Sequence, residues 1–173
     1  MWFRYPIIIL LFWLLAIIQM SITPFLNIGG VFANLIFILF YLLVFFEDIG
    51  QYRYSFFDTV TAGFFLDVIL PFSFGVSVIS LLIIYGLNKL ATHFLGRSFS
   101  KYFIVYFIVM FSLFFFLYNG LLFIASQFWG IPIDFSWNIF GSLLYNIFFA
   151  CLGFYVYLKI FRLPKSEDQL KLL

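Results

Sequence analysis

The sequence is poor in charge and in the side chains that bind metals or carry redox chemistry. Only 9% of its 173 residues are charged, and it contains one cysteine and one histidine. A single cysteine, Cys151, excludes an internal disulfide framework and a C-x-x-C redox pair. A single histidine, His93, excludes an H-E-x-x-H site and any cluster of histidine ligands. We therefore expect no resident metal and no cofactor.

Motifs for nucleotide chemistry and hydrolysis are also missing. No G-x-x-x-x-G-K-[ST] phosphate loop occurs, and the net charge of +2 comes from no basic domain on which nucleic-acid binding could rest. His93 is predicted to lie in a cytoplasmic loop, away from any membrane serine that it could activate. These absences predict a protein that has no catalytic residues and binds no nucleic acid.

Hydrophobic residues make up 66% of the chain, against about 45–50% in an ordinary soluble domain. Continuous apolar runs, each near the roughly 20 residues that cross a bilayer, favour helices over the alternating pattern of a barrel. The first run leads into Ser21–Phe25 without a small-residue cleavage pattern, so we expect it to be retained. The sequence predicts an all-α polytopic membrane protein, a single integral membrane domain over residues 1–173. Its helices are expected at 6–22, 28–46, 55–72, 74–90, 102–126 and 138–161, followed by a short cytoplasmic tail at 162–173.

All nine lysine and arginine residues fall on one side of this six-helix arrangement. The opposite loops contain none and carry Asp134. Because positive residues gather on the cytoplasmic side of a membrane, the pattern predicts cytoplasmic N- and C-termini in the inner (cytoplasmic) membrane. The positive residues are Arg4, Arg53, Lys89, Arg97, Lys101, Lys159, Arg162, Lys165 and Lys171.

Phenylalanine is unusually abundant, with 30 copies. Most of them lie away from the helix ends, where tyrosine and tryptophan are commonly found in membrane proteins. We interpret these phenylalanines as replacing leucine on surfaces that face lipid.

Asp67 lies well inside the third predicted helix, where a carboxylate costs roughly 2.5–3.5 kcal/mol at the bilayer centre. Gly63 lies one turn earlier on the same face, where a small residue permits close helix approach. The pair predicts a helix-packing or partner-docking site with Asp67 hydrogen-bonded inside the bundle. The alternative is that Asp67 is solvated near the outer boundary. Asp58 faces the opposite way, and we expect it to be in contact with water and near Arg53.

Two further patterns flank the fourth predicted helix. Pro71-Phe72-Ser73-Phe74-Gly75 predicts a sharp hairpin turn, because proline and glycine end one helix and start the next. After it, four residues at four-residue spacing would form one basic stripe if the helix continued. The stripe would contact anionic lipid or a partner; alternatively, its residues are ordinary orientation charges. They are Lys89, His93, Arg97 and Lys101.

Six amide side chains occur in or beside the apolar runs. Within membrane helices, amides bridge neighbouring helices by hydrogen bonds. We interpret most of them as helix-bridging residues; a polar transport path is the alternative. They are Gln19, Asn34, Asn88, Asn119, Asn138 and Asn146.

Together these features resemble the MreD family of bacterial rod-shape-determining membrane proteins. The resemblance covers roughly residues 20–90, through Pro24, the stretch from Tyr41 to Glu47, the G-x-x-x-D pattern of Gly63 and Asp67, and the turn at 71–75. Ala33-Asn34 stands where the family often has an acid near the start of the second helix. Outside this block, the resemblance is one of hydropathy.

The resemblance implies a non-catalytic scaffold of the cell-elongation machinery that supports peptidoglycan synthesis. Such proteins act with an MreC-like bitopic membrane protein, together with a RodA-like synthase, a class B penicillin-binding protein and MreB filaments. On this basis Gly63, Asp67, Pro71 and Gly75 are candidates for the packing core that holds a partner helix.

A compact bundle of six helices in a chain of this size is also similar to the substrate-binding subunit of energy-coupling-factor vitamin transporters. That subunit would need polar side chains gathered at its outer loops. This chain offers mainly Asn27, Gln127, Asp134 and Ser136 there. We therefore keep the transporter subunit as the alternative and favour the scaffold.

The predicted topology can be tested by labelling introduced cysteines. Cysteines placed near Asn27 and Asp134 are expected to react with an impermeant reagent added outside the cell, because both positions lie in outer loops. A cysteine near Arg97 is expected to stay unlabelled. Labelling near Arg97 would contradict the six-helix topology.

Overall fold

The computed structural model describes residues 4–21, 25, 31–46, 52–69, 75–95, 103–129 and 138–161. Within these ranges it contains six α-helices and no β-strand, which confirms the prediction of an all-α fold. Four of the helices, α1, α4, α5 and α6, are long and apolar enough to cross a membrane. The helices are α1 (Arg4–Ser21), α2 (Leu35–Phe46), α3 (Tyr52–Ile69), α4 (Val76–Leu95), α5 (Phe103–Trp129) and α6 (Asn138–Phe161).

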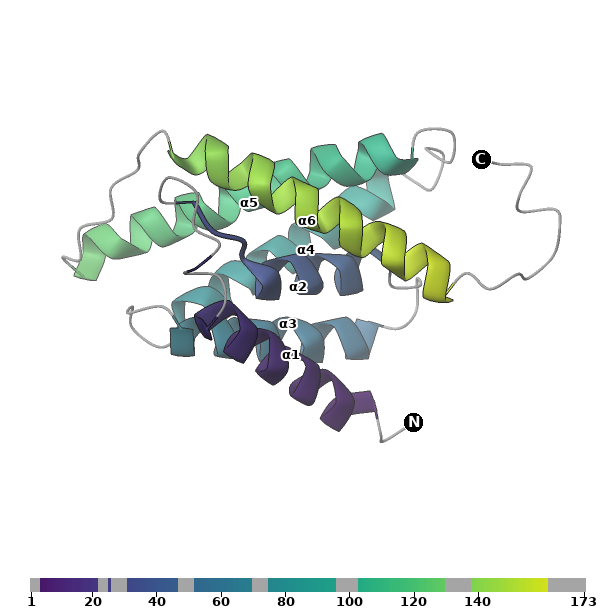
Figure 1. Ribbon diagram of the computed structural model, residues 1–173. Helices are drawn as coiled ribbons and strands as arrows, with labels where there is room; N and C mark the ends of the chain where they lie inside the picture. Colours follow the sequence, from purple (N-terminus) through teal and green to yellow (C-terminus); the bar gives the residue numbers. More distant parts are fainter. Residues whose placement is uncertain are drawn as a thin grey trace, which may run out of the picture.

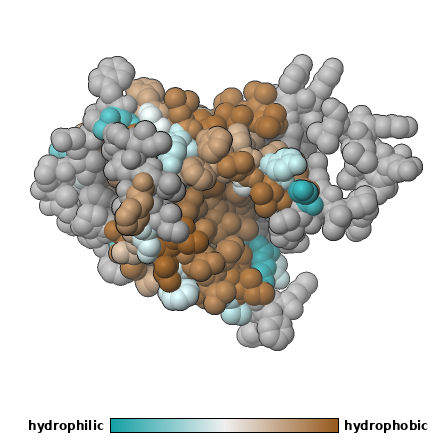
Figure 2. Space-filling view, in the orientation of Figure 1, coloured by the Kyte–Doolittle hydropathy of each residue, from teal (hydrophilic) through white to brown (hydrophobic). Residues whose placement is uncertain are grey.

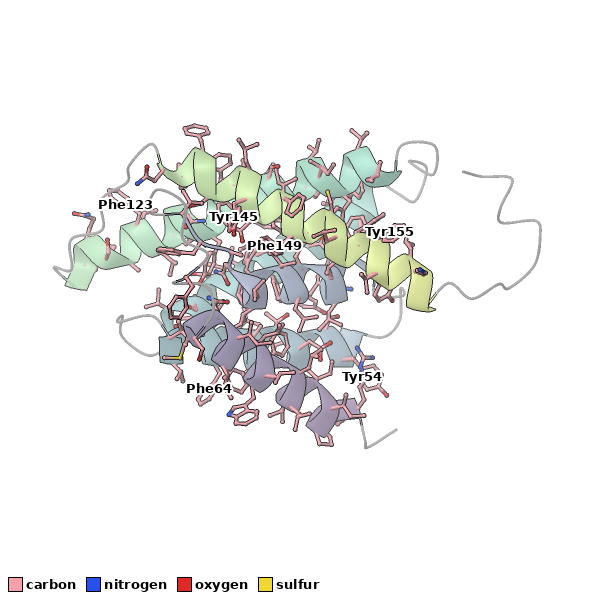
Figure 3. The ribbon with its side chains drawn as sticks, in the orientation of Figure 1. Tyr54, Phe64, Phe123, Tyr145, Phe149 and Tyr155 are labelled. Atoms are coloured by element: carbon pink, nitrogen blue, oxygen red, sulfur yellow. The ribbon has the colours of Figure 1, made fainter. Side chains whose placement is uncertain are left out.

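The helices form three layers (Figure 1). α5 and α6 make one outer layer, α1 and α3 make the other, and α2 lies between them beside α4. α2 contacts α1, α3, α4 and α6, so it is the central helix of the bundle. The beginnings of α1 and α3 and the end of α6 lie at the same end of the bundle, where Figure 3 labels Tyr54 and Tyr155.

The central helix is shorter than the sequence indicated. A helix was expected from residue 28, yet Val31 to Asn34 are not helical, and α2 begins at Leu35. Residues 28–30 lie outside the described part. With 12 residues, α2 is about 18 Å long, against a hydrocarbon core of about 30 Å. Val31 to Asn34 are therefore non-helical chain that leads into a short helix.

The other expected helices are present with shifted ends. α1 and α3 begin before their predicted first residues, and α6 has its predicted bounds. α4 continues to Leu95, five residues beyond its predicted end, and α5 continues to Trp129. The predicted last residues of the third helix, 70–72, lie outside the described part of the chain.

Phenylalanine lines the core of the bundle as well as its outer surface, so the expectation that it faces lipid describes only part of it; Phe94 and Phe148 are among the exposed ones. Six phenylalanines are at most 1% exposed. Between α2 and α5, Phe37 lies 5.1 Å from Tyr118, and Tyr41 lies 5.2 Å from both Phe107 and Phe111, measured between ring centres. Such aromatic pairs contribute about 0.5–1.5 kcal/mol beyond the burial of their area. The rings recur once per helical turn, so they form a continuous aromatic seam. The six are Phe12, Phe37, Phe40, Phe107, Phe111 and Phe114.

The surface in Figure 2 is largely hydrophobic. Large apolar side chains such as Leu10 on α1 and Leu144 on α6 are well exposed. Monomeric soluble proteins rarely expose contiguous apolar patches of this kind. The surface is that of a bundle surrounded by lipid or by other membrane helices.

Gly63 allows α3 and α4 to pack at very short distance. A Cβ atom at this position would lie 2.5 Å from the Cα of Val78, closer than real Cβ contacts. At Gly86, which lies on α4, a Cβ atom would meet nothing within 4 Å. Adding a methyl group is therefore expected to cost stability at Gly63 and not at Gly86.

Gly63→Ala is expected to destabilise the protein by about 1–3 kcal/mol, because the methyl group meets backbone atoms that cannot rotate away. For a chain of this size each kcal/mol lowers the melting temperature by about 2–4 °C. The measurement is thermal unfolding of the purified protein in detergent. Gly86→Ala is the matched control and is expected to be neutral or stabilising by up to about 1 kcal/mol, since alanine favours helix. Equal effects of the two substitutions would contradict the close α3–α4 contact.

Candidate functional site

Asp67 caps the start of α4 from the end of α3. One carboxylate oxygen accepts a hydrogen bond from the N–H of Gly75, and the other accepts one from the N–H of Ser77, both at 2.8 Å. The first N–H groups of a helix have no partner within the helix. Gly75 precedes α4 and has no side chain that could cap it. Asp67 supplies that cap, and its negative charge is favourable at a helix N-terminus.

Burial decides between the two environments considered for Asp67. The side chain is 3% exposed, so it lies inside the bundle and is not solvated. Gly75 has a φ of 101°, a conformation that glycine adopts without steric cost. Pro71, the other residue expected in this turn, lies outside the described residues.

The Asp67 cap is linked to a third helix. The hydroxyl of Tyr118 on α5 donates to Oγ of Ser77 at 3.4 Å, a long hydrogen bond. Gly63 packs on Val78 one residue further along α4. Asp67, Gly63 and Gly75 thus meet at the first turn of α4, where α3, α4 and α5 come together. We call this group, with Ser77 and Tyr118, the α4 cap.

A second polar cluster surrounds the start of α2. Asn34 accepts a hydrogen bond from the N–H of Phe37 at 3.1 Å, as an N-cap residue does. Gln19 of α1 accepts one from the N–H of Ile36 at 3.2 Å. Both amides therefore satisfy backbone groups at the start of the helix. We call this cluster, together with Asn146, the α2 cap.

Asn146 of α6 completes the α2 cap by holding the extended segment before the helix. Its Oδ1 accepts from the N–H of Asn34 at 2.7 Å, and its Nδ2 donates to the carbonyl of Phe32 at 3.2 Å. The same Nδ2 also donates to the carbonyl of Ser142 at 2.7 Å. Asn146 thus binds the segment as a neighbouring strand would, through one donor and one acceptor.

The sequence carries a helix-start signal at this cluster, which hydropathy alone does not show. Asparagine directly before an apolar run is a helix-start signal, and Asn34 stands directly before Leu35. Of the other amides, Asn119 donates to Phe115 of its own helix, and Asn138 is exposed at the start of α6. Asn88 is buried on α4.

An ion pair joins the first turn of α1 to α3. The Arg4 guanidinium lies 3.1 Å from Oδ2 of Asp58 and 4.4 Å from the ring centre of Tyr54. Asp58 is 2% exposed, so the expectation that it contacts water is wrong. The reason is that α1 packs along α3 and brings Arg4 over the carboxylate. The side chain of Arg53, the partner considered from the sequence, lies outside the described part.

The structure describes two of the four residues in the expected basic stripe. Lys89 and His93 lie one turn apart on α4, and His93 is exposed. Nζ of Lys89 lies 5.5 Å from the ring centre of Tyr85. Cations near the C-terminus of a helix are favourable. Arg97 and Lys101 lie outside the described residues.

The described polar groups are arranged to hold helices together. The two buried carboxylates of α3 serve different contacts: Asp58 binds Arg4 of α1, and Asp67 binds the start of α4. Among the residues that the structure describes, no three histidine, cysteine, aspartate or glutamate side chains are grouped so that they could hold a metal ion. The chemistry of these clusters is that of hydrogen bonding between helices.

Comparison with known proteins identifies no relative of this chain. No family model matches it, and searches of curated proteins and of solved structures give no significant match. The resemblance to the MreD family therefore rests on the residues quoted from the sequence.

Asp67→Asn is expected to destabilise the protein by about 1–3 kcal/mol, because an amide nitrogen cannot accept the hydrogen bond that one carboxylate oxygen now accepts. Hydrogen exchange measured by mass spectrometry should be faster in the first turn of α4. The first turn of α2, which Gln19 and Asn34 cap, serves as the internal control and should be unchanged. Equal acceleration at both helix starts would mean that Asp67 has no specific role at α4.

Proposed function

We propose that this protein is a non-catalytic membrane scaffold of a bacterial cell-elongation machinery. In this role it binds an MreC-like bitopic membrane protein and supports peptidoglycan synthesis by a RodA-like synthase and a class B penicillin-binding protein, with MreB filaments on the cytoplasmic side. The observation that carries the proposal is the α4 cap. There, the G-x-x-x-D residues that resemble the MreD family, Gly63 and Asp67, build a rigid α3–α4 pair.

The proposal includes six membrane crossings in the inner membrane, with both termini in the cytoplasm. It is supported by the common location of the beginnings of α1 and α3 and the end of α6 (Figure 1). Arg4, Lys89, His93 and Lys159 belong to segments at that end. In this arrangement α2 crosses only part of the membrane as helix, and the non-helical residues Val31 to Asn34 continue the crossing.

A scaffold needs a surface for its partner, and two peripheral helices offer one. α1 exposes Leu10 and Leu14, and α6 exposes Leu144, Phe148 and Leu152. These two surfaces lie in opposite outer layers of the bundle (Figure 1). Because the buried polar groups described above hold the chain itself together, we propose that the partner helix docks through apolar packing on one of these faces.

The alternative, a substrate-binding subunit of a vitamin transporter, has one observation in its favour. Helices interrupted within the membrane often form substrate sites in transporters, and α2 begins part-way through the bundle. However, the N–H groups of Ile36 and Phe37 are occupied by Gln19 and Asn34. A ligand at this helix start would have to displace side chains of the protein itself, so the scaffold is the better supported function.

The decisive experiment is purification of the tagged protein from its own membranes in mild detergent, with mass spectrometry of the proteins that accompany it. We expect an MreC-like protein and cell-wall synthases. Recovery of paired ATPases with a membrane coupling subunit would instead establish the transporter.

Surface variants then locate the docking face. Leu144→Ala with Phe148→Ala changes the α6 face, and Leu10→Ala with Leu14→Ala is the matched change on α1. One pair is expected to reduce recovery of the partner by tenfold or more, since losing about 1.4 kcal/mol of contact energy weakens binding tenfold. Full recovery with both pairs would contradict docking through these two helices.

A further inference from the structure

Asn88 is a buried amide without a hydrogen-bond partner in the part of the chain that the structure describes. The residue is 2% exposed, and neither Nδ2 nor Oδ1 makes a hydrogen bond. Leaving a buried donor or acceptor without a hydrogen bond is costly, and each such group in a native protein requires an explanation. Leucine would fill a similar volume without this cost. Asn88 therefore points to an arrangement in which its amide is paired.

The depth of Asn88 follows from the α4 cap. Ser77 of α4 and Tyr118 of α5 are in contact there, and the two helices run in opposite directions. Asn88 lies eleven residues after Ser77, and Phe107 lies eleven residues before Tyr118. At 1.5 Å per residue both are about 16 Å from the contact, so Asn88 and Phe107 lie at similar depth in the bundle.

A weak hydrogen bond lies at this depth. The hydroxyl of Tyr41 on α2 donates to the carbonyl of Phe107 at 3.3 Å, longer than the roughly 2.7–2.8 Å usual for a hydroxyl donor. Tyr41 is fully buried, and α4 contacts both α2 and α5. Asn88 lies on the buried face of α4 together with Leu81 and Ile84.

We propose that α4 has a second position in which the amide of Asn88 inserts between Tyr41 and Phe107. The Tyr41 hydroxyl then donates to Oδ1 of Asn88, and Nδ2 of Asn88 donates to the Phe107 carbonyl. One long hydrogen bond is exchanged for two, and both amide atoms are paired. The α2 cap contains the same arrangement: Asn146 accepts from the N–H of Asn34 and donates to the carbonyl of Phe32.

The α4 cap determines how the helix moves. Asp67 binds the first turn, Gly63 packs on Val78, and Tyr118 binds Ser77, so the outer end of α4 is fixed. The inner end, which carries Lys89 and His93, changes position. The fold thus contains a conformational device that couples hydrogen bonding in the core to the position of two basic side chains, Lys89 and His93, at one face of the bundle.

The expected movement is large enough to measure. The amide has to travel about one hydrogen-bond length, roughly 3 Å. Phe94 lies seventeen residues from Ser77 and Asn88 eleven, so a rigid pivot moves Phe94 by about 5 Å, in proportion to helix length. Phe94 is 81% exposed, and Tyr155 on α6 is also exposed at the same end, so both can carry a spin label.

The test measures spin-label distances in the full-length protein, reconstituted in lipid nanodiscs. Cys151→Ser removes the native cysteine, and Phe94→Cys with Tyr155→Cys gives the inner pair of labels. We expect two distances that differ by up to about 5 Å. Asn88→Leu is expected to leave one of them, because it removes both hydrogen bonds of the second position.

Two controls keep the result specific. Ser80→Ala changes another buried polar side chain of α4, nearer the fixed end, and should leave both distances present. A second pair of labels at Ile79 and Leu144, at the outer end, should give one distance in every variant. A single inner distance in the protein with Asn88, or two distances that persist after Asn88→Leu, would overturn the proposal.

Discussion

The backbone N–H groups at the start of α2 are the constraint on which the bundle depends. In an apolar environment each unpaired backbone group costs several kcal/mol, and Ile36 and Phe37 in the first turn of α2 are fully buried. The chain meets this requirement with Gln19 from α1, Asn34 from the segment before α2, and Asn146 from α6. Because these residues come from three parts of the sequence, capping α2 also fixes α1 and α6 around it.

The same solution recurs at α4, with a carboxylate in place of the amides. Asp67 caps α4 from α3, and Gly63 lets the two helices approach closely enough for the carboxylate to reach. Polar side chains thus set the positions of the helix ends. Aromatic rings fill the space between helices, as in the seam that joins Phe37 and Tyr41 to α5. The polar contacts are directional, whereas the aromatic contacts contribute buried apolar area.

The sequence was informative about the helices and less so about their contacts. Apolar runs alone predicted six helices, because length and hydropathy are local properties. The start of α2 was missed because Val31 to Ala33 extend the apolar run, and because Asn34 was read as part of the helix and not as its N-cap. The contact with Asn146, 112 residues away from Asn34, could not be read from the sequence. Asp58 was misplaced for the same reason, because its partner Arg4 is 54 residues away. Asp67 and Gly63 could be singled out because a carboxylate and a glycine in an apolar run are locally unusual.

The contrast between Asn146 and Asn88 shows what these caps imply for the behaviour of the protein. Both residues are buried amides in apolar helices, so the cost of leaving them unpaired is similar. Asn146 is fully paired and sits where three segments converge, which makes that region rigid. Asn88 is unpaired in the described arrangement and lies in the second half of α4, eleven residues beyond Ser77 of the fixed cap. A bundle built in this way combines a rigid outer half with an inner half in which a buried amide would gain hydrogen bonds by moving, and the basic residues Lys89 and His93 of α4 lie on that inner half.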